Sequence, residues 1–136
     1  MSFVVDASVA LAWHFEDEAS EYADRVLERL REDRAAAPSI WSLEVANALL
    51  VAERRGRLSP AKVSRAVELL LELPISIHDV AAESVLGPVL DLARAHGLSA
   101  YDAVYLELAM REGLPLATQD EALRAATQRV GVPLLD

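Results

Sequence analysis

Four acidic residues have the type and spacing to build one carboxylate site. Asp6 and Asp120 each come directly after a short apolar run, while Glu44 and Asp102 lie near the starts of expected helices. If the runs are parallel strands, these acids point to the edge of the sheet at which strands end and ligands bind. Each acid also has a simpler explanation, because acids at helix starts often cap the helix or favour its dipole. Position alone therefore leaves both interpretations open.

The region around Asp102 has the clearest structural pattern. Ser99 precedes Asp102 with the spacing of a capping box at a helix N-terminus. Between Asp102 and Arg111 only Glu107 is charged, which predicts a helix that is buried nearly all round. Arg111 stands four residues after Glu107 and is placed to pair with it. Gly113 fits the position after the helix, and the apolar run that follows predicts a buried parallel strand.

Strand-like runs and helical patterns alternate through most of the chain. We expect strands at 3–5, 35–37, 75–77, 114–117 and 132–135, and helices at 9–13, 19–31, 40–54, 60–73, 79–95, 100–112 and 121–128. Asp79 is expected to cap its helix, and Gly87-Pro88 to kink or split it. This alternation predicts a parallel sheet that is covered by helices on both faces.

Composition limits the class of protein. The chain of 136 residues is long enough for one domain with a real core, which we assign to residues 1–136. There is no apolar run of membrane-spanning length, no basic secretory leader and no cysteine, and these features suit a cytoplasmic protein. The net charge of −9 argues against broad affinity for nucleic acids. Lys62 is the only lysine, and the other basic residues are arginines, which make forked contacts with phosphate.

Four short motifs occur together and in order along the chain. They are Asp6-Ala7-Ser8, Glu44-Val45-Ala46-Asn47, Ser99-Ala100-Tyr101-Asp102-Ala103-Val104-Tyr105 and Thr118-Gln119-Asp120. In these motifs the whole chain resembles the PIN-domain nucleases, and most of all the VapC-type toxins of prokaryotic toxin–antitoxin pairs. The resemblance implies a three-layer α/β/α sandwich with a central, mostly parallel sheet. It also implies an endoribonuclease that depends on Mg²⁺ or Mn²⁺ and acts as the toxin of a type II system.

The resemblance further implies a role for the acids. Asp6, Glu44, Asp102 and Asp120 would be both the catalytic residues and the metal ligands. Clustered carboxylates cannot all stay ionised without cations, and oxygen ligands without His or Cys suit Mg²⁺ or Mn²⁺ rather than zinc. Such a site can activate water and stabilise the leaving oxygen of an RNA phosphodiester, with one or two metal ions.

Other polar residues of the motifs are expected to support the acids. Ser8, Asn47 and Thr118 have no histidine partner at a motif position, so none of them is an obvious nucleophile. We expect these three side chains to orient carboxylates or water.

Basic residues after the Glu44 motif are candidates for contact with RNA. Arg54, Arg55 and Arg57 follow at the end of the same expected helix, about 15 Å from Glu44. We expect them to guide the RNA backbone towards the acids. The alternative is structural, since basic side chains also favour a helix C-terminus.

The resemblance implies two protein partners, a second copy of the chain and a small antitoxin that inhibits it. We expect the antitoxin to lay an apolar helix in a groove beside the first and third helices and to place a basic side chain near the acids. The candidate groove residues are Trp13, Phe15, Trp41 and Leu43, although Trp41 and Leu43, each taken alone, are better explained as core.

Three other classes of protein require residues that this chain lacks. A phosphoacceptor domain needs a paired acid near its first strand and a late lysine, an aspartyl phosphatase needs a second Asp where Ser8 stands, and a P-loop enzyme needs a Gly-rich Lys-Ser/Thr motif. The chain has none of these features. Two alternatives stay open: a catalytically inactive PIN-like binding module, and a related structure-specific DNA nuclease, for which the chain is short.

Overall fold

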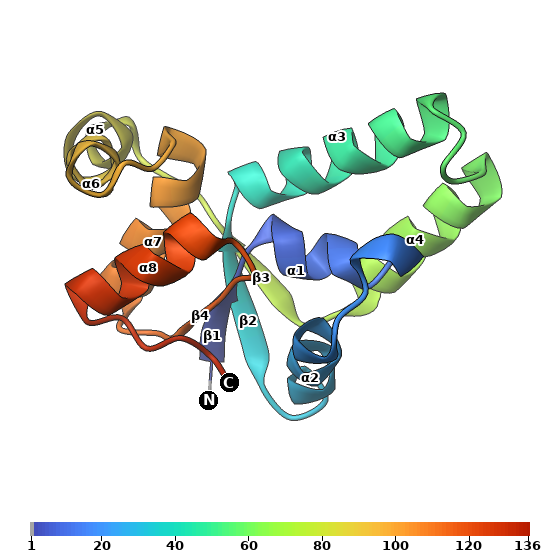
Figure 1. The fold of residues 1–136 in the computed structure, drawn as a ribbon, viewed down its shortest axis with the longest axis horizontal. Helices are drawn as coiled ribbons and strands as arrows, with labels where there is room; N and C mark the ends of the chain where they lie inside the picture. The colour runs from blue at the N-terminus through green and yellow to red at the C-terminus, as the bar shows by residue number, and fades with distance from the viewer. Residues whose placement is uncertain (1) are drawn as a thin grey trace.

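Four short strands form one parallel sheet in the centre of the molecule (Figure 1). The structure is a computed structural model and describes residues 2–136. The strands are β1 (Ser2–Val5), β2 (Arg34–Pro38), β3 (Ile75–His78) and β4 (Leu116–Ala117), in the order β3-β2-β1-β4. Every neighbouring pair is parallel, which confirms the predicted α/β class and its parallel central sheet.

Helices flank the sheet on both sides. In Figure 1 the helices on the right are α1 (Ala7–Ala12), α2 (Glu21–Arg29), α3 (Ile40–Arg54) and α4 (Pro60–Glu72). On the left are α5 (Ala82–Ser84), α6 (Leu90–His96), α7 (Ala100–Glu112) and α8 (Glu121–Val130). Two short segments complete the described chain, the 3₁₀ turn η1 (Glu16–Glu18) and the π-helical η2 (Val85–Val89). Within residues 2–136, no helix has the length and apolar character that crossing a membrane requires.

Helix α7 is a buried helix that contacts the sheet and helices α6 and α8 on the left side of Figure 1. It packs against β1, β2 and β4, and all its residues from Ala103 to Ala109 are buried, as predicted. These include Glu107, whose Oε1 accepts a hydrogen bond from Arg111 Nε at 3.0 Å, so the predicted pair is confirmed. Gly113 ends the helix with φ of 66°, a left-handed conformation that only glycine adopts without strain.

Strand β2 forms although alanine has a low preference for strands. It is paired on both sides, with Ala35 in register with Phe3 of β1 and Ile75 of β3. Its three alanines are all buried, and α3 and α7 both contact the strand. Tertiary pairing and close helix packing therefore outweigh the local preference.

The helix expected to start at Asp79 starts later and is interrupted. Its N-cap position is Ala81, which has no side-chain oxygen, so the predicted cap at Asp79 is wrong. Gly87 and Pro88 lie inside η2 and split the helix into α5 and α6, as predicted. Pro88 has no N–H and its ring crowds the preceding turn, and the wider π-helical turn accommodates both effects.

The last strand expected from the sequence is reduced to one bridge, between Leu134 and Leu116. Leu116 N donates to Pro133 O at 2.9 Å, and Leu135 N donates to Leu116 O at 2.9 Å. The ladder extends no further because β4 is only 2 residues long and because Pro133 has no N–H to donate.

Candidate active site

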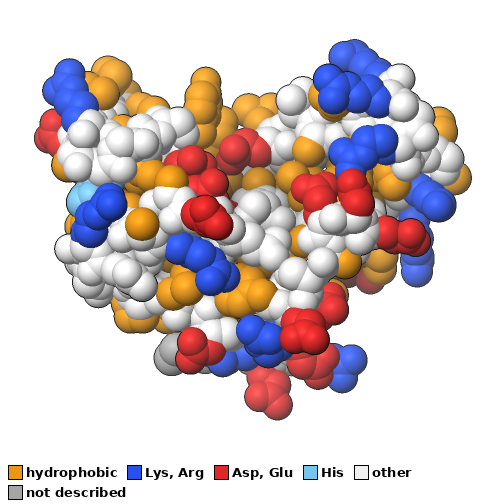
Figure 2. Space-filling view, in the orientation of Figure 1, with side chains coloured by type: hydrophobic (Ala, Val, Ile, Leu, Met, Phe, Trp, Pro, Cys, Tyr) orange, Lys and Arg blue, Asp and Glu red, His pale blue; other side chains and the backbone are white. Residues whose placement is uncertain are grey.

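The parallel sheet brings the four acids to one region. Asp6 directly follows β1, and Asp120 lies just beyond β4, the neighbour of β1 in the sheet. Asp102 lies in the first turn of α7, and Glu44 lies one turn into α3. Figure 2 shows acidic side chains in the hollow between two lobes, one formed by α5 and α6 and the other by α3 and α4.

The pKa values of these acids depend on neighbouring acids, and Asp102 takes part in each of these interactions. Burial is the main cause that raises the pKa of Asp6, Glu44 and Asp102. The charge of Asp102 further raises the pKa of Asp6 and of Glu44. Asp120 has the same effect on Asp102. Because like charges shift a pKa only over short distances, the structure places the other three predicted acids within electrostatic reach of Asp102.

Asp6 is the most buried of the acids, with 5% of its surface exposed. Its Oδ1 accepts hydrogen bonds from Ser8 Oγ at 2.7 Å and from Val9 N at 3.1 Å, so Asp6 also caps α1. Thr118 Oγ1 donates to Oδ2. Burial nevertheless raises the pKa of Asp6 from 3.8 to about 6, against these hydrogen bonds. Both oxygens of the carboxylate are thus held in place, and the hydroxyls of Ser8 and Thr118 orient it.

Glu44 is held by Tyr105, a residue for which no role was predicted from its motif. Tyr105 OH donates to Glu44 Oε1 at 2.5 Å, and the tyrosine side chain is otherwise buried. Burial, together with this bond, raises the pKa of Tyr105 well above its usual range, so the hydroxyl keeps its proton and acts as a donor. Tyr105 stands one turn after Asp102 in the same motif. A tyrosine on an otherwise apolar helix is the signal that could have identified it, since a buried hydroxyl needs a partner.

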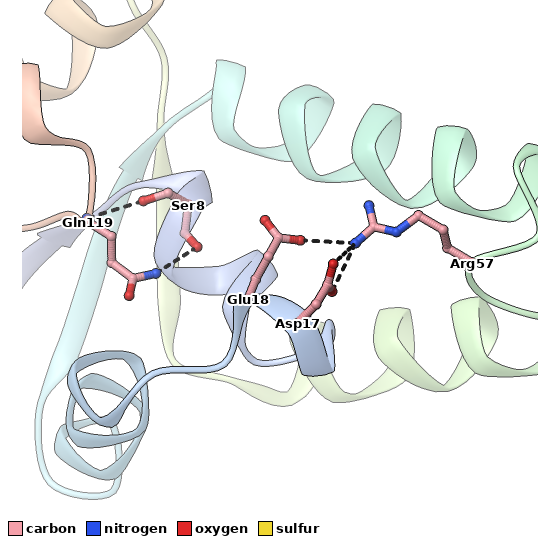
Figure 3. A network of polar contacts seen from close by, with 5 residues as sticks. All are labelled: Ser8, Asp17, Glu18, Arg57 and Gln119. Carbon is pink, nitrogen blue, oxygen red and sulfur yellow. Dashed lines mark hydrogen bonds and ion pairs between the residues drawn. The ribbon is translucent and has the colours of Figure 1, made fainter.

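Gln119 fixes the loop that follows β4. Its backbone N donates to Ser8 Oγ at 3.3 Å, and its Nε2 donates to Ser8 O at 3.4 Å (Figure 3). Its Oε1 accepts from Ser20 Oγ at 2.5 Å. Asp120 begins α8 at the end of this loop and caps it, with Oδ2 accepting from Leu123 N at 2.9 Å. Gln119 lies inside the Thr118-Gln119-Asp120 motif, yet its contacts with the first two helices could not be foreseen.

Asn47 behaves differently from the other expected supporting residues. It is exposed on α3, one turn after Glu44. Within residues 2–136, its side chain makes no hydrogen bond with any of the four acids. Of the three expected supporting residues, Ser8 and Thr118 therefore hydrogen-bond to an acid, Asp6, whereas Asn47 does not hydrogen-bond to any of the four within the described residues.

The three expected RNA-binding arginines have different surroundings. Arg57 Nη2 lies 3.0 Å from Asp17 Oδ2 and 3.5 Å from Glu18 Oε2 (Figure 3), and its guanidinium lies 4.6 Å from the centre of an aromatic ring. Two carboxylates of η1 thus offset its charge. Arg54 and Arg55 are exposed at the end of α3 and form no ion pair with the described residues. These two arginines have their charge available for phosphate.

The four expected groove residues do not share one groove. Phe15 and Trp41 are buried in the core, with 5% and 7% of their surfaces exposed. Trp13 and Phe15 line a cavity of about 570 Å³ together with residues of α4 rather than α3. Leu43 is 68% exposed and lines a second, apolar cavity of about 330 Å³ with Tyr101 and Val85. The prediction of a single groove beside the first and third helices is therefore wrong, because Phe15 and Trp41 are buried in the core and Trp13 and Leu43 line different cavities.

The oxygen atoms of this pocket suit a hydrated Mg²⁺ or Mn²⁺. As the side chains of residues 2–136 stand, no three acids or histidines meet closely enough to hold one ion. Mg²⁺ binds through one or two carboxylates and keeps several waters, so it does not need three protein ligands. Among the described residues, Asp120 uses only one of its carboxylate oxygens in a hydrogen bond, and no basic side chain forms an ion pair with the four acids.

An all-parallel α/β fold with an all-oxygen acidic pocket at the carboxyl edge of its sheet defines the class of protein. A family model described as "PIN domain" matches residues 3–128, so the chain belongs to the PIN-domain family. The resemblance predicted from the four motifs is thereby confirmed.

Similar proteins place the chain within this family. Ribonuclease VapC3 of Pyrobaculum aerophilum is 36% identical over 125 residues, which cover 90% of this chain and 92% of that protein. The crystal structure of PAE2754 from the same organism has a TM-score of 0.70 at 29% identity and covers 93% of this chain and 79% of that one. A toxin–antitoxin complex from Klebsiella pneumoniae, at 18% identity, covers 87% of this chain and 86% of its own, and its TM-score of 0.62 supports the fold. The predicted likeness to VapC proteins is confirmed.

Proposed function

We propose that the protein is a Mg²⁺-dependent endoribonuclease that acts as the toxin of a type II toxin–antitoxin system. The observation that carries this proposal is the group of four acids without a basic partner among residues 2–136, in which Asp102 raises the pKa of Asp6 and Glu44, and Asp120 raises that of Asp102. Such a pocket is built for a cation. The 36% identity to a protein named a ribonuclease supports RNA as the substrate.

The acids have separate tasks in this proposal. Asp6, Glu44, Asp102 and Asp120 would hold Mg²⁺ or Mn²⁺, which, when bound, lowers the pKa of water and stabilises the leaving oxygen of the phosphodiester. The hydroxyls of Ser8 and Thr118 fix the carboxylate of Asp6, and the hydroxyl of Tyr105 fixes that of Glu44. These bonds hold the ligands in position before a cation binds, which reduces the cost of ordering the site.

Two protein partners belong to the proposal, a second copy of the chain and a small antitoxin. Exposed apolar side chains beside the acids support a protein partner there. Leu43 is next to Glu44 and Tyr101 is next to Asp102, and they are 68% and 61% exposed. They line the same apolar cavity. Exposed apolar surface of this kind favours contact with another protein, and solved structures with this fold include a complex named toxin–antitoxin.

The substitution Asp102→Asn tests the assignment of the acids. It keeps the shape of the side chain and removes the charge that acts on both Asp6 and Glu44. We expect cleavage of a labelled single-stranded RNA in Mg²⁺ to fall by about 100-fold or more, with new RNA ends mapped for the wild type. Asp91→Asn, which changes an exposed acid of α6, is the matched control and should cleave at the wild-type rate.

The same assay separates the remaining alternatives. A labelled DNA of the same sequence, cut faster than the RNA, would favour a DNA nuclease. A wild-type protein that binds RNA and cuts neither substrate would favour an inactive binding module. Cleavage by Asp102→Asn at the rate of Asp91→Asn would remove Asp102 from the proposed site.

A further inference from the structure

Arg124 is fixed on both sides at the rim of the acidic pocket. It belongs to α8, one turn after Asp120, and its backbone N donates to Asp120 O at 2.9 Å. Its Nε donates to Thr118 O at 2.8 Å, and its guanidinium carbon lies 4.6 Å from the centre of the Tyr22 ring. A carbonyl and an aromatic face therefore hold a side chain that is normally flexible.

The residue that anchors Arg124 is itself part of the acidic pocket. Thr118 Oγ1 donates to Asp6 and accepts from Asp120 N at 3.1 Å. Tyr22 lies within electrostatic reach of both Asp6 and Arg124. Arg124 is thus connected to the acidic pocket through Thr118 and Tyr22.

Arg124 does not use this proximity to form an ion pair. Among residues 2–136, its Nη1 and Nη2 make no hydrogen bond and no salt bridge, whereas Arg57 and Arg111 are each paired with two carboxylates. A planar guanidinium that is held in place with two free amino groups is prepared to bind an external anion in a forked contact.

A second arginine lies near the same aromatic ring. Arg25 lies on α2, is exposed, and has its guanidinium carbon 5.8 Å from the centre of the same Tyr22 ring. It forms no ion pair among the described residues. Two guanidinium groups therefore lie near the ring of Tyr22, and we call this set the Tyr22 ledge (Tyr22, Arg25 and Arg124).

We propose that the Tyr22 ledge binds the backbone of single-stranded RNA, with Arg124 on a phosphate next to the one that is cut and Arg25 on the phosphate beyond it. This inference rests on the proposed nuclease function and names how its substrate is seated. Arg124 is four residues from Asp120, about 6 Å along a helix. Arg54 is about 15 Å along α3 from Glu44, so Arg124 is better placed to bind close to the cut.

Binding and cleavage of a labelled single-stranded RNA test the ledge. Binding is measured with Ca²⁺ in place of Mg²⁺, because Ca²⁺ also binds oxygen ligands, and at several salt concentrations. We expect Arg124→Gln to raise Kd about tenfold or more. The slope of log Kd against log salt should fall by about 0.7, the value for one phosphate contact on a single strand. Arg129→Gln, on an exposed arginine later in α8, is the control and should change neither quantity.

Two further variants keep the test decisive if Arg124→Gln is poorly folded. Arg25→Gln changes an exposed side chain, and we expect a smaller rise in Kd with a similar loss of salt slope. Arg124→Lys keeps one charge but not the fork, so it should retain the slope and bind more weakly than the wild type. The midpoint of thermal unfolding is measured for each variant.

The outcomes separate this inference from the proposed function. A wild-type protein that cuts RNA, with unchanged Kd and slope in Arg124→Gln and Arg25→Gln, would overturn the ledge and leave the nuclease intact. A loss of binding in Arg124→Gln with an unchanged salt slope would also overturn it, because Arg124 would then act only by holding Thr118. A wild-type protein that neither cuts nor binds RNA would defeat the proposed function itself.

Discussion

A buried carboxylate such as Asp6 is costly to ionise unless something offsets its charge. Ser8, Val9 and Thr118 all donate to it, and these bonds favour the charged form. Burial still dominates and raises its pKa from 3.8 to about 6. The folded protein therefore holds a proton on Asp6 at pH values where an unfolded chain would release it. At neutral pH the ionised, buried Asp6 therefore lowers the free energy of unfolding. Binding of a cation to the site would offset this loss.

This argument predicts that Asp6→Asn stabilises the protein when divalent metal is removed by EDTA. Between pH 3.8 and about 6 the folded state binds more protons than the unfolded state, so the wild type loses stability as pH rises through this window. The full shift corresponds to about 3 kcal/mol. Asn has nearly the same shape and no charge, and its amide can face Thr118. Urea unfolding at pH 8 should show the variant to be more stable by about 1–3 kcal/mol.

The same comparison at low pH provides the control. Well below pH 3.8 Asp6 is protonated in both states, so the advantage of Asp6→Asn should shrink towards zero. A variant that is less stable than the wild type at pH 8 would mean that the hydrogen bonds to the carboxylate outweigh its burial.

At the scale of elements, the sequence predicted those that carry their own local signals. The bounds of α3 agree with the expected 40–54, and Ser59 and Ser99 cap α4 and α7 as their positions indicate. The errors fall where tertiary contacts decide. The π-helical η2 and the single bridge at Leu134 depend on neighbouring segments, and no local pattern encodes them.

The candidate site likewise contains residues that local motifs predict and contacts that only the fold determines. The acids and Ser8 lie in compact motifs, so residue type and spacing identified them. The contacts of Tyr105 with Glu44 and of Gln119 with Ser8 join residues 61 and 111 positions apart. Arg124 gains its place only when α8 packs beside Tyr22. Such partners are fixed by the fold, and a single sequence gives no direct measure of them.

Two N-caps of the same type allow the role of α7 to be tested. Ser99 Oγ accepts from Asp102 N at 3.1 Å, and Ser59 Oγ accepts from Lys62 N at 3.2 Å. We expect Ser99→Ala and Ser59→Ala each to lower the free energy of unfolding by about 1 kcal/mol. Only Ser99→Ala should also slow RNA cleavage, because of these two helices only α7 has a proposed metal ligand, Asp102, in its first turn.

Urea unfolding and initial cleavage rates, measured on both variants under conditions where each is fully folded, make this comparison. Equal cleavage rates for Ser99→Ala and Ser59→Ala would show that the start of α7 tolerates disorder at the site. In that case the position of Asp102 would be set by packing of the helix body rather than by its cap.

For the whole molecule, the acidic pocket and the net charge of −9 pose a common problem. A polyanionic substrate approaches a protein that is itself negative, so attraction must come from local features. Figure 2 shows acidic side chains in the hollow between the lobes. Among the described residues, arginines without an ion pair lie at the end of α3 (Arg54 and Arg55) and beside Tyr22 (Arg25 and Arg124). A bound divalent cation would reduce the negative charge of the acids.

The cation should therefore stabilise the whole fold and not only support cleavage. A ligand at a concentration 100 times its Kd adds about 2.7 kcal/mol to the free energy of unfolding. We expect Mg²⁺ and Mn²⁺ to raise the midpoint of thermal unfolding more than NaCl at equal ionic strength, which controls for screening of the net charge. The rise should be larger at pH 8 than at pH 5, because protonated carboxylates bind metal poorly. In Asp102→Asn the difference between Mg²⁺ and NaCl should disappear, and an undiminished rise in this variant would place the stabilising ion elsewhere on the acidic surface.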